Sequence, residues 1–296
     1  MTSRRFLSVV VLAAAVAAVS HVTVPNPQAQ GGAPPAAQAA PGFVQQAGGL
    51  TSAPARRATE GLGPFRTLTI RNVMVIDGTG APPAGPMTIT VEGNRITRIA
   101  SAGTPGVQQA GRAGGRGAAP NAQGPAGPAG NDGTYVLDGS GMYLLPGFID
   151  MHVHAGGAPK NADAEYAYKL WLAHGVTTVR GVPMGSHNLT VSEKARSEKN
   201  EIVAPRIINY QRPGQGWSGG AVDTPEKARE WVRWGKANGL DGLKLGAEEP
   251  SLMAALLDEA KKLNMGSTAH LQQSGVAQMN AIKAARLGLQ TVTHFY

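Results

Sequence analysis

The chain has 296 residues, a net charge of +8 and no cysteine, a length that allows one large domain or two smaller ones. Without cysteine there is neither a disulfide nor a thiolate, so a metal site must draw mainly on histidine or carboxylate ligands. The basic residues form no block and do not alternate with aromatics, which argues against a nucleic-acid partner, while 40 glycines and 21 prolines predict disordered segments.

The first twenty residues have the pattern of a secretory signal. Arg4 and Arg5 precede an apolar run over residues 6–19, and small residues end the segment. The run is shorter than the roughly 20 apolar residues of a membrane span, so an uncleaved anchor is the weaker alternative. We therefore predict a secreted or periplasmic protein without a stable membrane span after cleavage. The arginine pair leaves both general and twin-arginine export open.

Two low-complexity segments flank the parts of a small β domain. Residues 21–64 are rich in Ala, Pro, Gly and Gln, which predicts a disordered linker. Short-period apolar patterns over 68–76 and 87–100 predict a small antiparallel sheet within residues 65–143. Residues 102–133 interrupt this domain as a low-complexity insertion.

The remainder of the chain, residues 144–296, alternates strand and helix. The helix expected after Asp223 has Thr224 and Pro225 as start signals and ends at a glycine. Strands that alternate with helices at this spacing predict a parallel sheet. The six predicted strands cover 148–154, 177–182, 206–210, 242–246, 267–271 and 291–296.

Two histidines stand at the end of the first of these strands, in "LLPGFIDMHVHAG". Side chains alternate along a strand, so His152 and His154 point the same way, about 7 Å apart. At the carboxyl end of a parallel strand they face the side where α/β enzymes place their chemistry. Two imidazoles there suit a borderline metal ion such as zinc. A structural histidine pair is the alternative interpretation.

Three further strands carry candidate ligands. His270 lies in "STAHL" and His294 in "TVTHFY", while Lys244 lies between two leucines in "GLKLG". A lysine inside a buried strand is costly unless it is paired or neutral. A neutral amine can add carbon dioxide and become a carbamate. The alternative is an ammonium that reaches solvent or pairs with Asp241 or Glu248.

Together these segments resemble the amidohydrolase superfamily, in particular its imidazolonepropionase-like and Xaa-Pro dipeptidase-like branch. The resemblance rests on "LLPGFIDMHVH", "GVTTVRGV", "GLKLG", "STAH" and "VTH", and on "RNVMVIDGTG" and "ITVEGNRITRIA" further upstream. It covers residues 66–296 apart from the insertion. It implies an α/β fold, a (β/α)8 TIM-type barrel with a small N-terminal β-sandwich domain. With six predicted strands, we expect the barrel to be truncated.

The resemblance also implies a binuclear site. His152 and His154 would hold the more buried metal ion and His270 and His294 the second, with a carboxylated Lys244 bridging both. A hydroxide between the ions would attack a carbonyl that one of them polarises. The expected cofactors are two divalent metal ions, with zinc first and manganese, cobalt or iron also compatible with these ligands.

The sequence departs from the family pattern at two points. The family's eighth barrel strand carries an aspartate that binds metal and moves the proton, but the predicted strands stop at six. We therefore expect the sequence to be a fragment, with the general acid/base absent from it. In addition, Gly181 follows "TTVR" where the family pattern has an aspartate.

The expected function is hydrolysis of a C–N bond in an amide, peptide or cyclic amide. The substrate would be a small molecule or dipeptide, and the protein could form a homo-oligomer. Two alternatives remain open, an inactive metal-binding remnant and a mononuclear deaminase or esterase of the same superfamily. The mononuclear site would follow if Lys244 is not carboxylated.

Five other side chains are weaker candidates for the site. A histidine near a helix end, His174, has a structural role in this interpretation. His187 is expected in the loop after the second strand, as a weak substrate contact. The segment after the third strand offers pocket candidates in Tyr210, Gln211 and Trp217, for which ordinary loop roles are the alternative.

Overall fold

The computed structural model describes residues 9–10, 50–102, 133–154, 163–181 and 184–294. Outside these ranges lie most of the predicted signal segment, the first part of the predicted linker, and nearly all of the predicted insertion over 102–133. No helix in the described ranges is long and apolar enough to cross a membrane.

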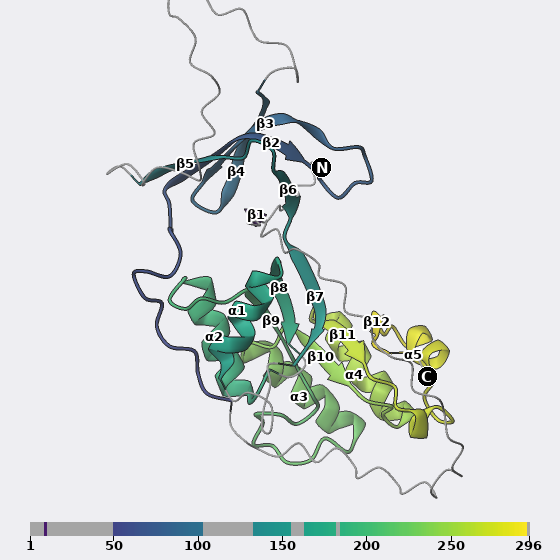
Figure 1. Cartoon of the computed structure of the whole chain (residues 1–296). Helices are drawn as coiled ribbons and strands as arrows, with labels where there is room; N and C mark the ends of the chain where they lie inside the picture. Colours follow the sequence, from purple (N-terminus) through teal and green to yellow (C-terminus); the bar gives the residue numbers. More distant parts are fainter. Residues whose placement is uncertain (1–8, 11–49, 103–132, 155–162, 182–183, 295–296) are drawn as a thin grey trace, which may run out of the picture.

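Two six-stranded sheets form the molecule (Figure 1). The first is mixed and consists of β1 (Val9–Val10), β2 (Thr67–Val75), β3 (Ala84–Glu92), β4 (Arg95–Ser101), β5 (Thr134–Asp138) and β6 (Tyr143–Pro146). Strands β2, β3 and β4 are antiparallel neighbours, as predicted. Strands β5 and β6 both pair in parallel with β2, one after the other along it. One mixed sheet therefore stands where the sequence predicts a β-sandwich.

The second sheet is parallel throughout, and its strands follow chain order. It consists of β7 (Phe148–Val153), β8 (Val176–Gly181), β9 (Arg206–Gln211), β10 (Gly242–Leu245), β11 (Gly266–Ala269) and β12 (Thr291–Val292). All six predicted strands are confirmed, with ends that differ by a residue or two except at β12. Strand β12 is shorter than predicted, and residues 295–296 lie outside the described ranges.

Helices connect these strands and cover the outer face of the sheet (Figure 1). They are α1 (Ala164–Ala173), α2 (His187–Glu198), α3 (Pro225–Ala237), α4 (Pro250–Lys262) and α5 (Ala281–Arg286), with a short 3-10 turn η1 (Gln273–Gly275) before α5. The predicted start of α3 is confirmed, because the Thr224 side chain accepts a hydrogen bond from the backbone nitrogen of Lys227 at 3.2 Å. Trp231 of α3 and Leu256 of α4 are fully buried in the largest apolar core, against β10 and β11.

The parallel sheet curls strongly about its interior face. His152 on β7 and His294 directly after β12 have ring centroids 5.1 Å apart. In a flat sheet, five strand spacings of about 4.8 Å would separate these strands by about 24 Å. The curl therefore brings side chains from the two edge strands together inside a half-barrel. This shape is consistent with a TIM-type barrel that lacks its last strands.

Residues 50–64, which the sequence places in the disordered linker, are ordered along α1 and α2, and we call them the strap. Ser52 Oγ donates to Glu193 Oε1 at 2.6 Å, and the Ala53 nitrogen donates to Glu193 Oε2 at 3.1 Å. The Arg56 nitrogen donates to the Glu201 carbonyl at 2.8 Å. A buried carboxylate on α2 thus orders a segment whose composition, averaged over 21–64, resembles a linker.

Candidate metal centre

The predicted histidine pair lies at the carboxyl end of β7. Asp150 Oδ1 accepts a hydrogen bond from the backbone nitrogen of His152 at 3.0 Å. This bond fixes the backbone directly before the histidine pair. The Nε2 atoms of His152 and His154 lie 3.2 Å apart. Both rings therefore face the same side of the strand, as the two-residue spacing predicts.

The four predicted histidines form a continuous row of imidazole rings. Ring centroids are 5.1 Å apart between His154 and His152, 5.1 Å between His152 and His294, and 4.6 Å between His294 and His270. Three different strands supply these rings, β7 and the ends of β11 and β12. The fold therefore gathers all four side chains that the sequence identifies as metal ligands.

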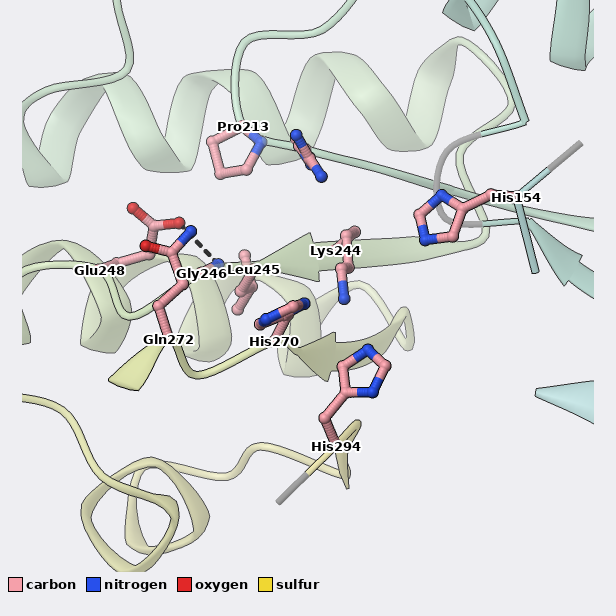
Figure 2. A pocket seen from close by; sticks show the side chains of 10 residues that line it. His154, Pro213, Lys244, Leu245, Gly246, Glu248, His270, Gln272 and His294 are labelled. Carbon is pink, nitrogen blue, oxygen red and sulfur yellow. Dashed lines mark hydrogen bonds between the residues drawn. The ribbon is translucent and has the colours of Figure 1, made fainter. Parts of the chain in front are cut away.

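Lys244 lies beside this row on the inner face of β10 (Figure 2). Its side chain is 2% exposed, and its Nζ donates to Thr293 Oγ1 at 3.3 Å. The acidic residues that could have paired with it are engaged elsewhere, since Asp241 binds Lys194 and Glu248 accepts from the Gly246 nitrogen. The alternative of an ammonium paired with Asp241 or Glu248 is therefore wrong in this structure.

A cavity of about 510 Å³ opens beside Lys244 and three of the histidines. Figure 2 shows Lys244, His154, His270 and His294 toward one end, with Glu248 and Gln272 toward the other. The residues that line it are His154, Arg212, Pro213, Lys244, Leu245, Gly246, Glu248, His270, Gln272 and His294. The cavity thus joins the histidine row to a polar wall large enough for a small substrate.

The interior of the site favours neutral bases. Burial lowers the pKa of His152 to about 3, with Lys244 and the neighbouring rings adding to the effect. Burial, followed by the charges of Lys244 and His294, also lowers the pKa of His270. Burial, with Arg212 and Arg180 nearby, lowers the pKa of Lys244 to about 8. Neutral imidazoles are the form that binds metal ions.

The donor set fits a metal ion in pairs. Two nitrogen ligands of one tetrahedral zinc ion, each about 2.0–2.1 Å from it, lie roughly 3.3 Å apart, close to the separation of the His152 and His154 Nε2 atoms. His152 Nδ1 is buried without a hydrogen-bond partner in the described residues. Within the same residues, no three His, Asp or Glu side chains are arranged as a ready metal cage. His152 and His154 therefore form one preformed pair of nitrogen donors.

The candidates on and after β9 do not line the cavity. The ring of Tyr210 packs against Arg180, whose guanidinium carbon lies 5.0 Å from the ring centroid. Gln211 is buried on the opposite face and donates to Thr190 Oγ1 of α2 at 3.3 Å. Trp217 packs against the core of α3 and α4. Their roles are structural in this fold.

Two predicted histidines lie outside the row. His187 is the first residue of α2, in place of the expected loop, and its buried ring lies 5.0 Å from that of Trp234. It does not line the cavity, which corrects its prediction as a substrate contact. His174 caps the end of α1, where its Nδ1 lies 2.8 Å from the Leu170 carbonyl oxygen, in line with the structural role expected for it.

Sequence reasoning missed several residues of the cavity wall. Arg212 and Pro213 follow β9, Gln272 follows β11, and Glu248 was considered only as a partner of Lys244. All of them lie just past the carboxyl end of a strand, which is the position where parallel α/β proteins build their sites. That position alone could have identified them.

Gly181, where the resemblance leads us to expect an aspartate, has a local explanation. A Cβ atom on Gly181 would lie 2.2 Å from Cγ of Met184. The buried Met184 side chain therefore occupies the space into which a larger residue at position 181 would extend.

Comparison with known proteins gives limited sequence similarity. No protein-family model matches the chain. The chain is 29% identical to an adenine deaminase of Clostridium botulinum over 121 residues, which cover 37% of this chain and 19% of that protein. It is 27% identical to a dihydroorotase of Shouchella clausii over 153 residues, covering 49% and 34% respectively.

The fold is shared with a solved hydrolase. A prolidase crystallised with N-methylphosphonate-L-proline matches 77% of this chain with a TM-score of 0.55 and 19% identity, and 60% of the prolidase is covered. The chain thus spans less than two thirds of each of these proteins. All three proteins are amidohydrolase-superfamily enzymes, in agreement with the motifs.

Proposed function

We propose, from its confirmed likeness to the amidohydrolase superfamily, that this protein is a metal-dependent hydrolase of C–N bonds. The observation that carries the proposal is the gathering of four histidines and a buried lysine from β7, β10, β11 and β12. Three of these histidines and the lysine line one cavity. These side chains stand at the carboxyl ends of parallel strands, where such enzymes act.

In this proposal the histidines hold two divalent metal ions, with zinc as the first expectation. His152 and His154 would bind one ion and His270 and His294 the other, with the carbamate of Lys244 between them. The ions would supply Lewis acidity toward the scissile carbonyl group. The low pKa of His152 and His270 supports this assignment, because both rings are neutral and ready to bind metal at pH 7.

The environment of Lys244 supports carboxylation. With a pKa of about 8, about one amine in ten is neutral at pH 7, far more than for an exposed lysine. The neutral nitrogen would attack carbon dioxide, forming an N–C bond and releasing one proton to water. Thr293 Oγ1, 3.3 Å from Nζ, holds the nitrogen in place for this step.

The cavity wall suits a small substrate with polar ends. Arg212 places a guanidinium and Glu248 a carboxylate on the wall, so a dipeptide with free ends is electrostatically matched. The structural likeness to a prolidase supports a dipeptide, and the sequence likeness to a dihydroorotase supports a cyclic amide.

A mononuclear deaminase is the second candidate. The sequence similarity to adenine deaminase favours it. So does the 3.2 Å separation of the His152 and His154 Nε2 atoms, which form one pair of donors. In that case the pair His152 and His154 would hold the essential ion, and Lys244 would stay an amine.

Metal content separates these candidates. Elemental analysis of the purified protein should find about two ions per chain, and Lys244→Met should lower this number to one or none. Lys194→Met is the matched control, because Lys194 lies on α2 and pairs with Asp241 outside the half-barrel. One ion per wild-type chain, unchanged in Lys244→Met, favours the mononuclear site, and no metal in the wild-type protein would refute both.

A substrate panel tests the reaction itself. Dipeptides with C-terminal proline, N-acyl amino acids, cyclic amides and adenine should be incubated with metal-loaded protein and followed by mass spectrometry. We expect hydrolysis of at least one amide substrate and its loss in Lys244→Met. Ammonia release from adenine alone would favour the deaminase.

We also propose that the protein is exported, on the strength of residues 1–20. Cell fractionation and N-terminal sequencing of the mature protein should place it outside the cytoplasm with these residues removed. Replacing Arg4 and Arg5 by lysine would block export only if the twin-arginine route is used.

A further inference from the structure

A buried arginine spans the interior of the half-barrel below the histidine row. Arg180, on β8, is 3% exposed. Its Nε donates to the Met151 carbonyl of β7 at 2.7 Å, its Nη1 to Thr291 Oγ1 of β12 and its Nη2 to Thr268 Oγ1 of β11, both at 3.3 Å. The guanidinium also lies 5.0 Å from the ring centroid of Tyr210 on β9. One side chain therefore contacts four other strands.

These contacts are possible only because the sheet is curled. Strand β12 is four strand spacings from β8, which is about 19 Å in a flat sheet. A hydrogen bond of 3.3 Å between Arg180 and Thr291 requires the interior to close around the guanidinium. The side chain thus acts as a cross-brace between strands that are not neighbours.

The three hydrogen-bond acceptors stand next to the histidine-bearing segments. Met151 directly precedes His152, and Thr268 lies two residues before His270. Thr291 lies three residues before His294. The planar fork of one guanidinium therefore sets the relative positions of all three segments that supply imidazoles.

The burial of Arg180 lowers the stability of the fold. Within the described residues, Arg180 forms no ion pair and donates only to neutral oxygen atoms. Burial of an unpaired charge is costly, and an apolar side chain of similar size is often at least as favourable for stability. Stability therefore does not account for an arginine at this position, whereas a rigid multidentate donor does.

We propose that Arg180 is a positioning residue that holds β7, β11 and β12 at the spacing that the histidine row needs to bind metal. The proposal rests on the proposed function, since it takes the histidines as ligands. Arg180 acts through the strands and touches neither ligand nor substrate.

The test measures metal binding in the full chain. Arg180→Met removes the fork, and Arg180→Lys keeps the charge but not the fork. Titration with Co²⁺ should show an affinity lower by about 10–100-fold in both variants, together with a changed visible absorption spectrum. Arg196→Met is the matched control, because Arg196 binds Glu193 on the outer layer and should change neither the affinity nor the spectrum even if it lowers stability.

A second pair of substitutions covers the case in which the Arg180 variants do not fold. The double variant Thr268→Val and Thr291→Val keeps the arginine and side-chain volume but removes two acceptors. It should weaken Co²⁺ binding by about 10-fold and alter the spectrum. Wild-type affinity and spectrum in any folded Arg180 variant, or in this double variant, would overturn the proposal. So would an equal change in Arg196→Met.

A metal-free measurement separates this proposal from the proposed function. If the wild-type protein binds no metal, the hydrolase proposal fails, and imidazole NMR resonances of the metal-free protein then decide the role of Arg180. Shifts of the resonances of His152, His270 and His294 in Arg180→Lys, absent in Arg196→Met, support positioning. Unchanged resonances overturn it.

Discussion

Charges inside the half-barrel and charges on its helical outer layer are treated differently by this fold. On the outer layer, Lys194 pairs with Asp241 at 2.7 Å and Arg196 with the buried Glu193 at 2.6 Å. Inside, in the part of the chain that the structure describes, Arg180 and Lys244 donate only to neutral oxygen atoms. We therefore expect the outer charges to stabilise the fold and the inner charges to cost stability, which fits the functional role proposed for them.

The largest effect on stability is expected from the outer layer. Glu193→Ala should lower the free energy of unfolding by about 3–5 kcal/mol, because Arg196 loses its carboxylate and the strap loses two acceptors. Urea unfolding measures this. Glu198→Ala, an exposed position on the same helix, is the control and should change stability by less than about 0.5 kcal/mol. Equal effects of the two substitutions would contradict the role of the strap.

Inside the half-barrel, we expect the substitution of a charged residue to raise the free energy of unfolding. In metal-free protein, Lys244→Met should raise the free energy of unfolding by about 1–3 kcal/mol, because a buried amine with a single long hydrogen bond is replaced by an apolar side chain. The same substitution should abolish metal-dependent activity. A loss of stability in metal-free Lys244→Met would remove the contrast between the two layers.

The pH dependence of stability should also come from a residue inside the half-barrel, His152. The folded pKa of His152, about 3, lies below the ordinary value of 6.5, so only the unfolded chain takes up a proton between these values. The contribution of His152 is fully present above pH 6.5 and is lost as the pH falls toward 3. Thermal unfolding of metal-free His152→Leu at pH 7.5 and 5 should show a smaller difference than wild type. His174→Gln, at an exposed helix end, should retain the wild-type difference.

The smallest effect on stability is expected at an exposed ion pair of the outer layer. The side chain of Arg233 is 54% exposed and binds Glu259 at 2.9 Å. Arg233→Gln should lower the free energy of unfolding by less than about 1 kcal/mol, because water screens such pairs. Metal content should not change. A loss as large as that in Glu193→Ala would show that exposure does not separate the outer charges.

The strands and their chemistry were accessible from the sequence for a simple reason. The strands of the parallel sheet are short segments bounded by turn residues and separated by helical segments, and Lys244 stands out in the apolar strand GLKL. The row of four histidines then follows from topology, because the carboxyl ends of parallel strands meet on one side.

The missed features lack such a pattern. Helix α2 has a polar sequence, HNLTVSEKARSE. It is held by the Ser186 cap and by tertiary contacts of Glu193 with the strap and of Thr190 with Gln211, rather than by an apolar face. The bracing role of Arg180 needs the curl of the sheet, which no local pattern encodes. Both the formation of α2 and the contacts of Arg180 therefore depend on tertiary structure.

The strap determines where the N-terminal part of this chain can be truncated. From residue 50 the chain runs along α1 and α2, then forms strands β2 to β6 of the mixed sheet from Thr67 onward, and continues through β6 directly into β7. These five strands are therefore anchored to the half-barrel at both ends. A truncation at residue 65, chosen to discard a linker, would remove the Ser52 and Ala53 partners of the buried Glu193 carboxylate. A truncation near residue 49 would leave the outer layer intact.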